Sequence, residues 1–193
     1  FLAHLTASPR HAMMLAGANI RVILATVHIA LKEVSAALSA GLIAEKIRLA
    51  REYLPAFGFP SPRIAVAGLN PHAGEAGAFG REEIEIISPA VEACRGEGID
   101  VSGPLPPDTL FHRLHRGEFE AAVTMYHDQG LIPLKMIAFA EGVNITLGLP
   151  FVRTSPDHGT AYDIAGKGVA DPRSMIAAMG LAEKLAASWP GKE

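Results

Sequence analysis

The sequence lacks several features that would each point to a particular class of protein. A single cysteine, Cys94, excludes an internal disulfide and fits a reducing compartment, so we expect a cytoplasmic protein. Aromatic residues make up only 6% of the chain, too few for a platform that stacks the bases of a single strand. The net charge is −3 and no basic run occurs, so nothing points to nucleic acid or to an anionic membrane surface.

Long hydrophobic runs are also missing, because no apolar stretch reaches the length of a membrane span. The 193 residues are 49% hydrophobic and 19% charged, which is typical of a globular protein with one sizeable core or two small lobes. The chain begins at Phe1, in a stretch with the pattern of the middle of a helix. We therefore expect it to be part of a longer protein.

Short apolar, β-branched runs alternate with segments of helical period, which predicts an α/β chain with a largely parallel sheet. The first two predicted strands flank Gly17-Ala18-Asn19, a turn signal that indicates a hairpin. The expected strands are 10–15, 21–26, 63–68, 99–103, 121–126, 143–149 and 151–154. The expected helices are 39–57 with Ser39 as its cap, 81–96, 108–115 with Asp108 as its cap, 131–139 and 172–187.

Ligands of such sheets bind beyond the carboxyl ends of the strands. Three of the predicted strands, 21–26, 63–68 and 121–126, run into loops that each carry a histidine: His28, His72 and His127. Three imidazoles with one open position suit a catalytic metal ion. Spacing alone does not show that they converge, and three exposed or hydrogen-bonded loop histidines remain the other interpretation.

The segment Asp157–Pro172 has too many turn formers for a strand, and it reads as a structured loop that runs into a helix. Gly159 and Gly166 permit positive φ or a close backbone approach, and Thr160 is able to cap the segment after it. Asp163 places a carboxylate near exposed amides, an arrangement that suits a nucleotide diol and pyrophosphate. From composition alone, a glycine-rich surface turn capped by Asp is the favoured interpretation.

This segment, with its run His158-Gly-Thr-Ala-Tyr-Asp-Ile-Ala-Gly-Lys-Gly168, resembles the adenosine-binding loop of the isocitrate and isopropylmalate dehydrogenase superfamily. That superfamily does not use the Gly-x-Gly-x-x-Gly fingerprint, which is also missing here. The resemblance implies a two-domain αβα fold and a cofactor site at His158, Gly159, Thr160 and Asp163. It assigns Asp163 to the adenosine ribose, and a 2′-phosphate there would meet like charge, which favours NAD over NADP.

Four further motifs are similar to the 4-hydroxythreonine-4-phosphate dehydrogenase family, and together the similarity runs from about Phe1 to Lys184. These motifs are Asn70–Glu75, Gly103–Thr109, Met125–Gly130 and Gly142–Thr154. The family resemblance implies NAD-dependent oxidation of 4-phosphooxy-L-threonine to 2-amino-3-oxo-4-phosphooxybutanoate. Decarboxylation then gives 3-amino-2-oxopropyl phosphate, on the route to vitamin B6.

The resemblance also assigns roles to individual residues. It implies a divalent metal bound at a homodimer interface by His28, His72 and His127, with His127 expected from the partner chain. The substrate contacts it implies are Lys135, Asn144 and Arg153.

The residue types fit that chemistry. A bound metal ion lowers the pKa of the alcohol, NAD takes the hydride, and the metal or Lys135 stabilises the enolate left by loss of CO₂. Asp128 either orients a ligand or accepts a proton, and a plain helix cap is its other interpretation. Three imidazoles favour Zn²⁺, whereas substrate oxygens would also accept Mg²⁺, and Co²⁺ stays open.

Family members are longer than this chain, and the part that would precede Phe1 supplies contacts to the substrate phosphate. We expect residues 1–133 to be an inserted metal, substrate and dimerisation domain, and 134–193 the returning part of the NAD-binding domain. On this view the chain binds metal but catalyses poorly. The alternatives are a related dehydrogenase of a phosphorylated sugar acid, such as phospho-threonate or phospho-erythronate, and a non-catalytic metal-binding dimerisation fragment.

Overall fold

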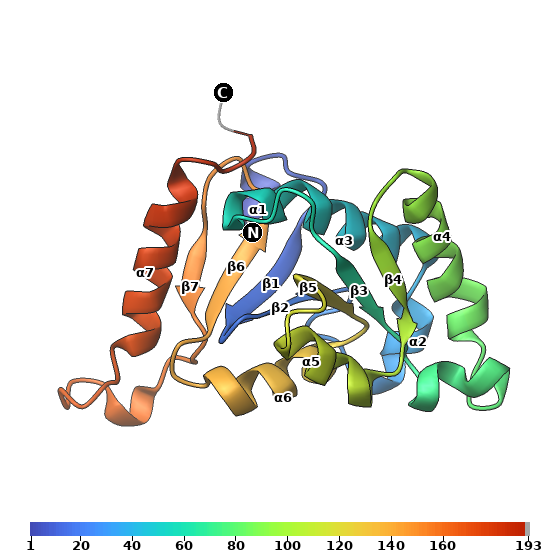
Figure 1. The fold of residues 1–193 in the computed structure, drawn as a ribbon. Helices are drawn as coiled ribbons and strands as arrows, with labels where there is room; N and C mark the ends of the chain where they lie inside the picture. The colour runs from blue at the N-terminus through green and yellow to red at the C-terminus, as the bar shows by residue number, and fades with distance from the viewer. Residues whose placement is uncertain (192–193) are drawn as a thin grey trace.

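The computed structural model describes residues 1–191, which form one seven-stranded sheet with helices on both faces (Figure 1). The strand order is β4-β3-β5-β2-β1-β6-β7. The strands are β1 (Ala12–Gly17), β2 (Ile20–Leu24), β3 (Ile64–Ala67), β4 (Val101–Leu105), β5 (Ala121–Thr124), β6 (Val143–Leu147) and β7 (Thr154–Pro156). The α-helices are α1 (Leu2–Leu5), α2 (Val34–Ala37), α3 (Ala40–Tyr53), α4 (Ser88–Gly96), α5 (Pro107–His115), α6 (His127–Ala138) and α7 (Arg173–Ala186).

The sheet has a parallel half and an antiparallel half. Strands β4, β3, β5 and β2 are parallel, whereas β2, β1, β6 and β7 pair antiparallel in turn. The predicted hairpin is confirmed, with Ala18 and Asn19 at positive φ between β1 and β2. The α/β class is confirmed as well, although the antiparallel share is larger than a largely parallel sheet implies.

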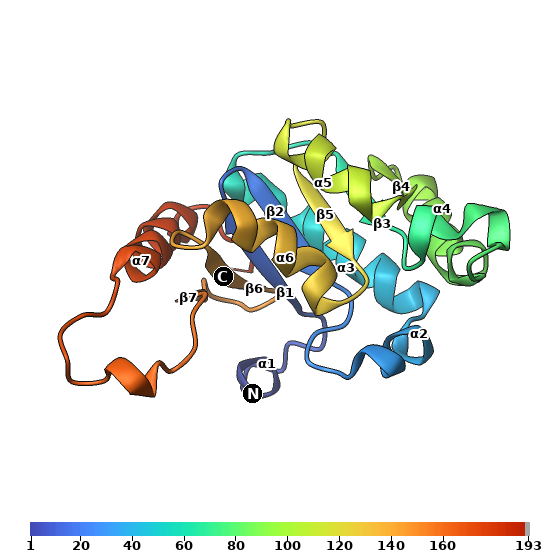
Figure 2. The same ribbon diagram turned by 90° about the horizontal axis from the view of Figure 1, so that it is seen from below.

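Two apolar layers hold the helices to the sheet. Helices α3, α4 and α7 pack on one face, where Ile47, Val91 and Leu185 are buried among β-strand side chains. Helices α5 and α6 cover the other face through Leu110, Leu114, Leu131 and Leu134. The result is an α/β/α sandwich, visible in Figures 1 and 2. None of the helices within residues 1–191 is long and apolar enough to cross a membrane.

Most predicted elements lie close to their expected places. Ser39 caps α3, since its Oγ accepts a hydrogen bond from the Leu42 amide at 3.2 Å. The prediction that Asp108 caps α5 is wrong, because Pro106 occupies the cap position and Asp108 lies in the first turn. Helix α6 begins at His127 instead of 131, directly after β5. His127 and Asp128 are therefore helical, with Tyr126 at the cap position.

The expected domain boundary at 133/134 falls inside α6, whose two ends belong to the same helix. Strand β6, from beyond that boundary, pairs with β1 from before it. Within this chain both parts therefore share one sheet, and the assignment of the two parts to separate domains stays a prediction.

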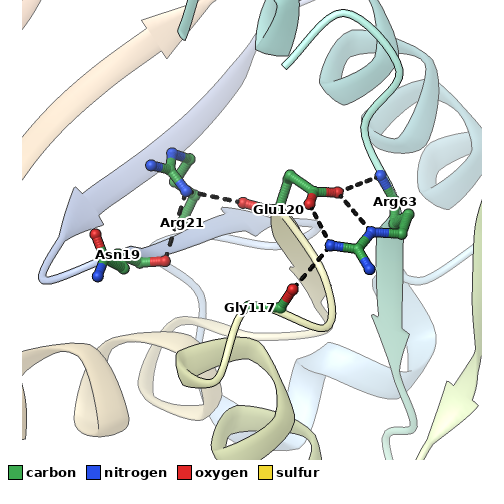
Figure 3. Close-up of polar contacts among 5 residues, drawn as sticks. All are labelled: Asn19, Arg21, Arg63, Gly117 and Glu120. Atoms are coloured by element: carbon green, nitrogen blue, oxygen red, sulfur yellow. Dashed lines mark hydrogen bonds and ion pairs between the residues drawn. The ribbon is translucent and has the colours of Figure 1, made fainter. Parts of the chain in front are cut away.

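The amino ends of β2, β5 and β3 are joined by a set of polar contacts (Figure 3). The Arg63 guanidinium donates to both carboxylate oxygens of Glu120, at 2.6 and 3.3 Å, and to the Gly117 carbonyl at 2.8 Å. Burial raises the pKa of Glu120, but the hydrogen bonds from Arg63 outweigh it and lower that pKa overall. Arg21 reaches the carbonyl oxygens of Asn19 and Glu120 from the next strand. Arg63 and Glu120 are thus paired within the chain, whereas the buried Nε of Arg21 has no hydrogen-bond partner among the described residues.

Candidate metal and substrate site

The three histidine-bearing loops lie at the opposite edge, where the parallel strands β2, β3 and β5 end. Hydrogen bonds tie these loops together. The Thr26 hydroxyl donates to the Met125 carbonyl at 2.7 Å, which fixes the loop before His28 against the one before His127. The buried Gln129 side chain accepts from the Met125 amide and donates to the Gly68 carbonyl, both at 2.7 Å.

His28 and His127 come together at this edge. Their ring centroids are 5.4 Å apart with an angle of 43° between the planes. Both rings line a cavity of about 270 Å³, with Tyr126 and Asp128 among its other walls. His127 Nδ1 lies 2.7 Å from Asp128 Oδ1, a contact that orients the ring and leaves Nε2 free.

His72 lies in a turn of unusual backbone conformation. Residues 72–76 all have positive φ, from +42° to +80°, in the 3₁₀ segment Pro71–Gly77. Left-handed backbone costs each residue other than glycine about 1–2 kcal/mol, so strong contacts have to hold the turn. The His72 ring packs near Phe79, with centroids 6.2 Å apart. Among residues 1–191 no three His, Cys, Asp or Glu side chains gather closely enough to hold one metal ion.

The predicted substrate residues Asn144 and Arg153 line a second cavity of about 480 Å³, which His28 also borders. Arg153 Nη1 makes only long contacts, 3.4 Å to Asn144 Oδ1 and 3.5 Å to Thr146 Oγ1. Within the described chain no carboxylate pairs with Arg153, in contrast to Arg63. A half-buried guanidinium without a carboxylate partner is suited to an anionic ligand.

Lys135 lies two turns after His127 on α6 and faces a third cavity, of about 420 Å³, with His158 and Gly159. Its Nζ is 3.3 Å from Asp157 Oδ2 and 3.4 Å from the Asp157 carbonyl. Lys135 and His127 also border a common groove on α6. The structure thus places Lys135 between the histidine pair and the start of the glycine-rich segment.

The rest of the glycine-rich segment extends away from the sheet between β7 and α7 (Figure 2). Thr160 and Asp163 are exposed, and Asp163 lies in the short 3₁₀ turn Tyr162–Ile164. Thr160 caps nothing, since Ala161 holds the cap position of that turn. Within residues 1–191 the Asp163 carboxylate accepts no hydrogen bond. These two residues stay apart from the Lys135 cavity.

Several residues that organise this edge escaped the sequence reasoning. Gln129 lies in the Met125–Gly130 motif and links two loops, and its only signal was a polar side chain directly after a histidine and an aspartate. Lys46 lines the Arg153 cavity, where its Nζ donates to the His11 carbonyl at 2.8 Å. Glu83 is 2% exposed, and its only signal was a Glu pair at a helix start.

A family model described as "Pyridoxal phosphate biosynthetic protein PdxA" matches residues 1–182. The 4-hydroxythreonine-4-phosphate dehydrogenase of Desulforapulum autotrophicum is 62% identical over 182 residues, which is 94% of this chain and 54% of that protein. The enzyme of the same name from Bradyrhizobium diazoefficiens is 52% identical over 193 residues, covering 97% and 56%. The chain thus spans about half the length of the curated relatives it matches.

Solved structures agree with these relatives. The 4-hydroxythreonine-4-phosphate dehydrogenase of Klebsiella pneumoniae matches with a TM-score of 0.88 and 51% identity, over 95% of this chain and 56% of that one. A terephthalate 1,2-cis-dihydrodiol dehydrogenase from Burkholderia xenovorans matches with a TM-score of 0.78 and 33% identity, over 95% and 59%. By the extent of the family match and the level of identity, this chain belongs to the PdxA family of pyridoxal phosphate biosynthetic proteins.

Proposed function

We propose that this chain carries the metal site and part of the substrate and cofactor site of an NAD-dependent 4-hydroxythreonine-4-phosphate dehydrogenase. The reaction is oxidation of 4-phosphooxy-L-threonine followed by decarboxylation to 3-amino-2-oxopropyl phosphate, in vitamin B6 synthesis. The observation that carries the proposal is the pairing of His28 with His127, beside an Arg153 that has no carboxylate partner in the described chain. The names of the relatives support the same reaction.

The residues fit a divalent metal ion. A ring-centroid separation of 5.4 Å is compatible with two imidazoles that share one ion, and Asp128 is placed to orient His127 from behind. His72 does not join them within the described chain, so we propose that the third ligand is His72 of a second copy. This keeps a metal site shared between the subunits of a homodimer. However, it assigns His127 to the same chain as His28, which differs from the sequence-based expectation.

The residues also fit an anionic substrate. Arg153 and Asn144 border the same cavity as His28, so a phosphate or carboxylate on the guanidinium would lie next to the metal ligands. Lys135 lines the groove that also contains His127, and the Lys135 ammonium group forms an ion pair with Asp157. In this arrangement Arg153 and Asn144 bind an anionic group of the substrate, and the Lys135 ammonium group approaches it from the groove that also contains His127.

The cofactor assignment rests on His158 and Gly159, which border the Lys135 cavity, and on Asp163, whose carboxylate oxygens are free for a ribose diol. When bound, NAD supplies the hydride acceptor, and a divalent cation supplies a Lewis acid that favours the alkoxide. Zn²⁺ fits the imidazole ligands best, with Mg²⁺ and Co²⁺ as alternatives. For the proton at the alcohol, Lys135 and Asp128 are the candidates, and Asp128 is already engaged with His127.

A second substrate class is a phosphorylated sugar acid such as phospho-threonate or phospho-erythronate. The structural likeness to a protein named as a dihydrodiol dehydrogenase supports it, because this fold also occurs in a protein named for a substrate other than 4-phosphooxy-L-threonine. The two phosphorylated substrates differ by an amino or a hydroxyl group at C2. A non-catalytic metal-binding protein is the third candidate.

The proposal is tested by the metal content of the purified chain, and then by NADH formation with each phosphorylated substrate. We expect about one metal ion per chain in the parent, with loss of metal in His28→Ala and His127→Ala. His112→Ala, which removes a histidine of α5, is the matched control and should keep the metal. Metal retained in both site variants would contradict the proposal, and metal without NADH formation would favour the binding protein.

A further inference from the structure

Glu83 is a buried carboxylate that the proposed chemistry does not use. It is 2% exposed and lies at the start of the π-helical turn Glu83–Ile87, ahead of α4. Its Oε1 accepts hydrogen bonds from the backbone amides of Leu69 and Asn70, both at 2.7 Å. Its Oε2 accepts from Asn70 Nδ2 at 2.9 Å. Glu83 thereby holds the backbone just before His72.

Its neighbour Glu82 extends the contact to a second histidine-bearing loop. Glu82 Oε2 accepts from Asn70 Nδ2 at 2.8 Å, and Glu82 Oε1 accepts from the Ser35 hydroxyl at 2.6 Å. The hydrogen bonds from Ser35 and Asn70 lower the pKa of Glu82, so this carboxylate stays ionised in its place. Because Ser35 belongs to α2, which comes after the His28 loop, the acidic pair joins the His28 and His72 segments.

The left-handed turn is built around this carboxylate. Gly74 lies in the middle of the turn at φ +80°, and a Cβ at this position would be 2.6 Å from Glu83 Oε2. The turn therefore closes over the carboxylate with no space for a side chain at Gly74. Leu69 and Asn70 donate to Glu83 just before the turn, and Gly74 lies against the same carboxylate in the middle of the turn, so Glu83 contacts the unfavourable backbone of residues 72–76 and the residues that lead into it.

We propose that Glu83, with Glu82, is a positioning residue that holds the 72–76 turn left-handed and so sets where His72 is presented to a metal ion. This inference rests on the proposed function, in which His72 is a ligand. A carboxylate that acts only on stability would change melting without changing the metal-bound spectrum or the conformation of the turn. A positioning residue changes both.

The first test is NMR of the metal-free chain. Residues at positive φ give strong intraresidue NOEs between the amide and Hα protons, so His72, Ala73 and Ala76 report the turn directly. We expect these NOEs in the parent and in Glu83→Gln, whose amide oxygen still accepts from Leu69 and Asn70. In Glu83→Ala they should weaken, together with the exchange protection of the Leu69 and Asn70 amides. Glu83→Ala with unchanged NOEs would overturn the inference.

The second test is titration with Co²⁺, whose absorption spectrum reports the number of ligands. We expect Glu83→Ala to weaken binding by about 10–100-fold and to lower the coordination number, and Glu83→Gln to restore both towards the parent. Glu85→Gln, on an exposed carboxylate paired with Arg81, is the matched control and should bind as the parent does. An altered turn with parent affinity and spectrum would also overturn the inference.

Two further variants keep the outcomes separate. If Glu83→Ala does not fold, Asn70→Ala removes only the side-chain donor shared by the two carboxylates, and we expect a smaller loss in the same two measurements. Parent-like NOEs and Co²⁺ binding in that variant would contradict the inference. His72→Ala tests the proposed function by itself. If Co²⁺ binding is unchanged in that variant, His72 is not a ligand, and the NOEs of the Glu83 variants still decide whether Glu83 holds the turn.

Discussion

Strand β3 is held by a glutamate at each end, and the two contacts differ in what they leave free. At the amino end, Glu120 accepts from the Arg63 backbone amide and pairs with the Arg63 guanidinium near solvent (Figure 3). At the carboxyl end, the buried Glu83 accepts from Leu69 and Asn70 and pairs with no cation in the described chain.

The same contrast separates two arginines of the sheet. Arg63 is neutralised by Glu120, whereas Arg153 has only long contacts to Asn144 and Thr146. The Arg63–Glu120 pair at the amino edge is thus complete within one chain, whereas the carboxyl edge keeps the Arg153 guanidinium without a carboxylate partner beside the rings of His28 and His127. Groups that are left without partners at the ligand-binding edge of a sheet indicate where a ligand belongs.

The largest expected effect is on metal affinity. His127→Ala should weaken Zn²⁺ or Co²⁺ binding by about 100-fold or more, because it removes a ligand and not a group behind one. Asp128→Asn should cost about tenfold, since it only disturbs the ring orientation. Calorimetric titration with Zn²⁺ measures both. Equal effects of the two changes would mean that His127 is not a direct ligand.

The next largest effect is a difference in stability between variants of Glu83 and Glu120. Glu83→Ala leaves two partly buried amides without an acceptor, and we expect a loss of about 2–4 kcal/mol of unfolding free energy. Glu120→Ala should cost about 1 kcal/mol, because its partners are near solvent. Urea unfolding monitored by circular dichroism gives both values. A larger loss at Glu120 would reverse the comparison between the two ends of β3.

A smaller effect is expected from lysine at the two arginine positions. Arg153→Lys should weaken binding of 4-phosphooxy-L-threonine by about tenfold, since lysine cannot make a planar two-point contact with an oxyanion, and should leave the melting temperature unchanged. Arg63→Lys should lower the melting temperature and leave binding of 4-phosphooxy-L-threonine unchanged. Substrate titration and thermal melting of both variants distinguish the open arginine from the closed one.

The smallest effect concerns acid stability. Hydrogen bonds from Ser35 and Asn70 lower the pKa of Glu82 in the folded chain below its ordinary value of 4.5. The stability this carboxylate contributes is therefore present above that value and is lost as the pH falls through the lowered pKa. Glu82→Gln should flatten the acid side of a stability–pH curve. An unchanged slope would mean that Glu82 is not engaged in solution.

Local pattern was enough to predict the hairpin, the cap at Ser39 and the position of three histidines just after the ends of strands. These features depend on residues close in sequence. The start of α6 at His127 was missed because Tyr126 offers no side-chain cap and the apolar period begins later. The antiparallel return through β6 and β7 is set by tertiary pairing with β1, which spacing does not reveal.

The candidate site was predictable in its residue types but not in its grouping. The strand ends indicated His28, His72 and His127, and the family resemblance set His127 apart as the partner chain's ligand. The structure instead brings His28 and His127 of one chain together and holds His72 in a turn of its own. The role of Glu83 depends on hydrogen bonds from two backbone amides, 13 and 14 residues away in the sequence. Every residue other than proline has a backbone amide, so the residue types of the donors give no sign of such a contact.

The most direct test of the central claim is to mix two variants that are each unable to complete the metal site. One is His72→Ala, and the other carries His28→Ala and His127→Ala. If His28 and His127 bind from one chain and His72 from another, mixed dimers regain one site for each pair of chains, and Co²⁺ binding returns on mixing. Co²⁺ binding that stays absent from the mixture, while the parent binds the metal, would contradict a site divided in this way between two copies.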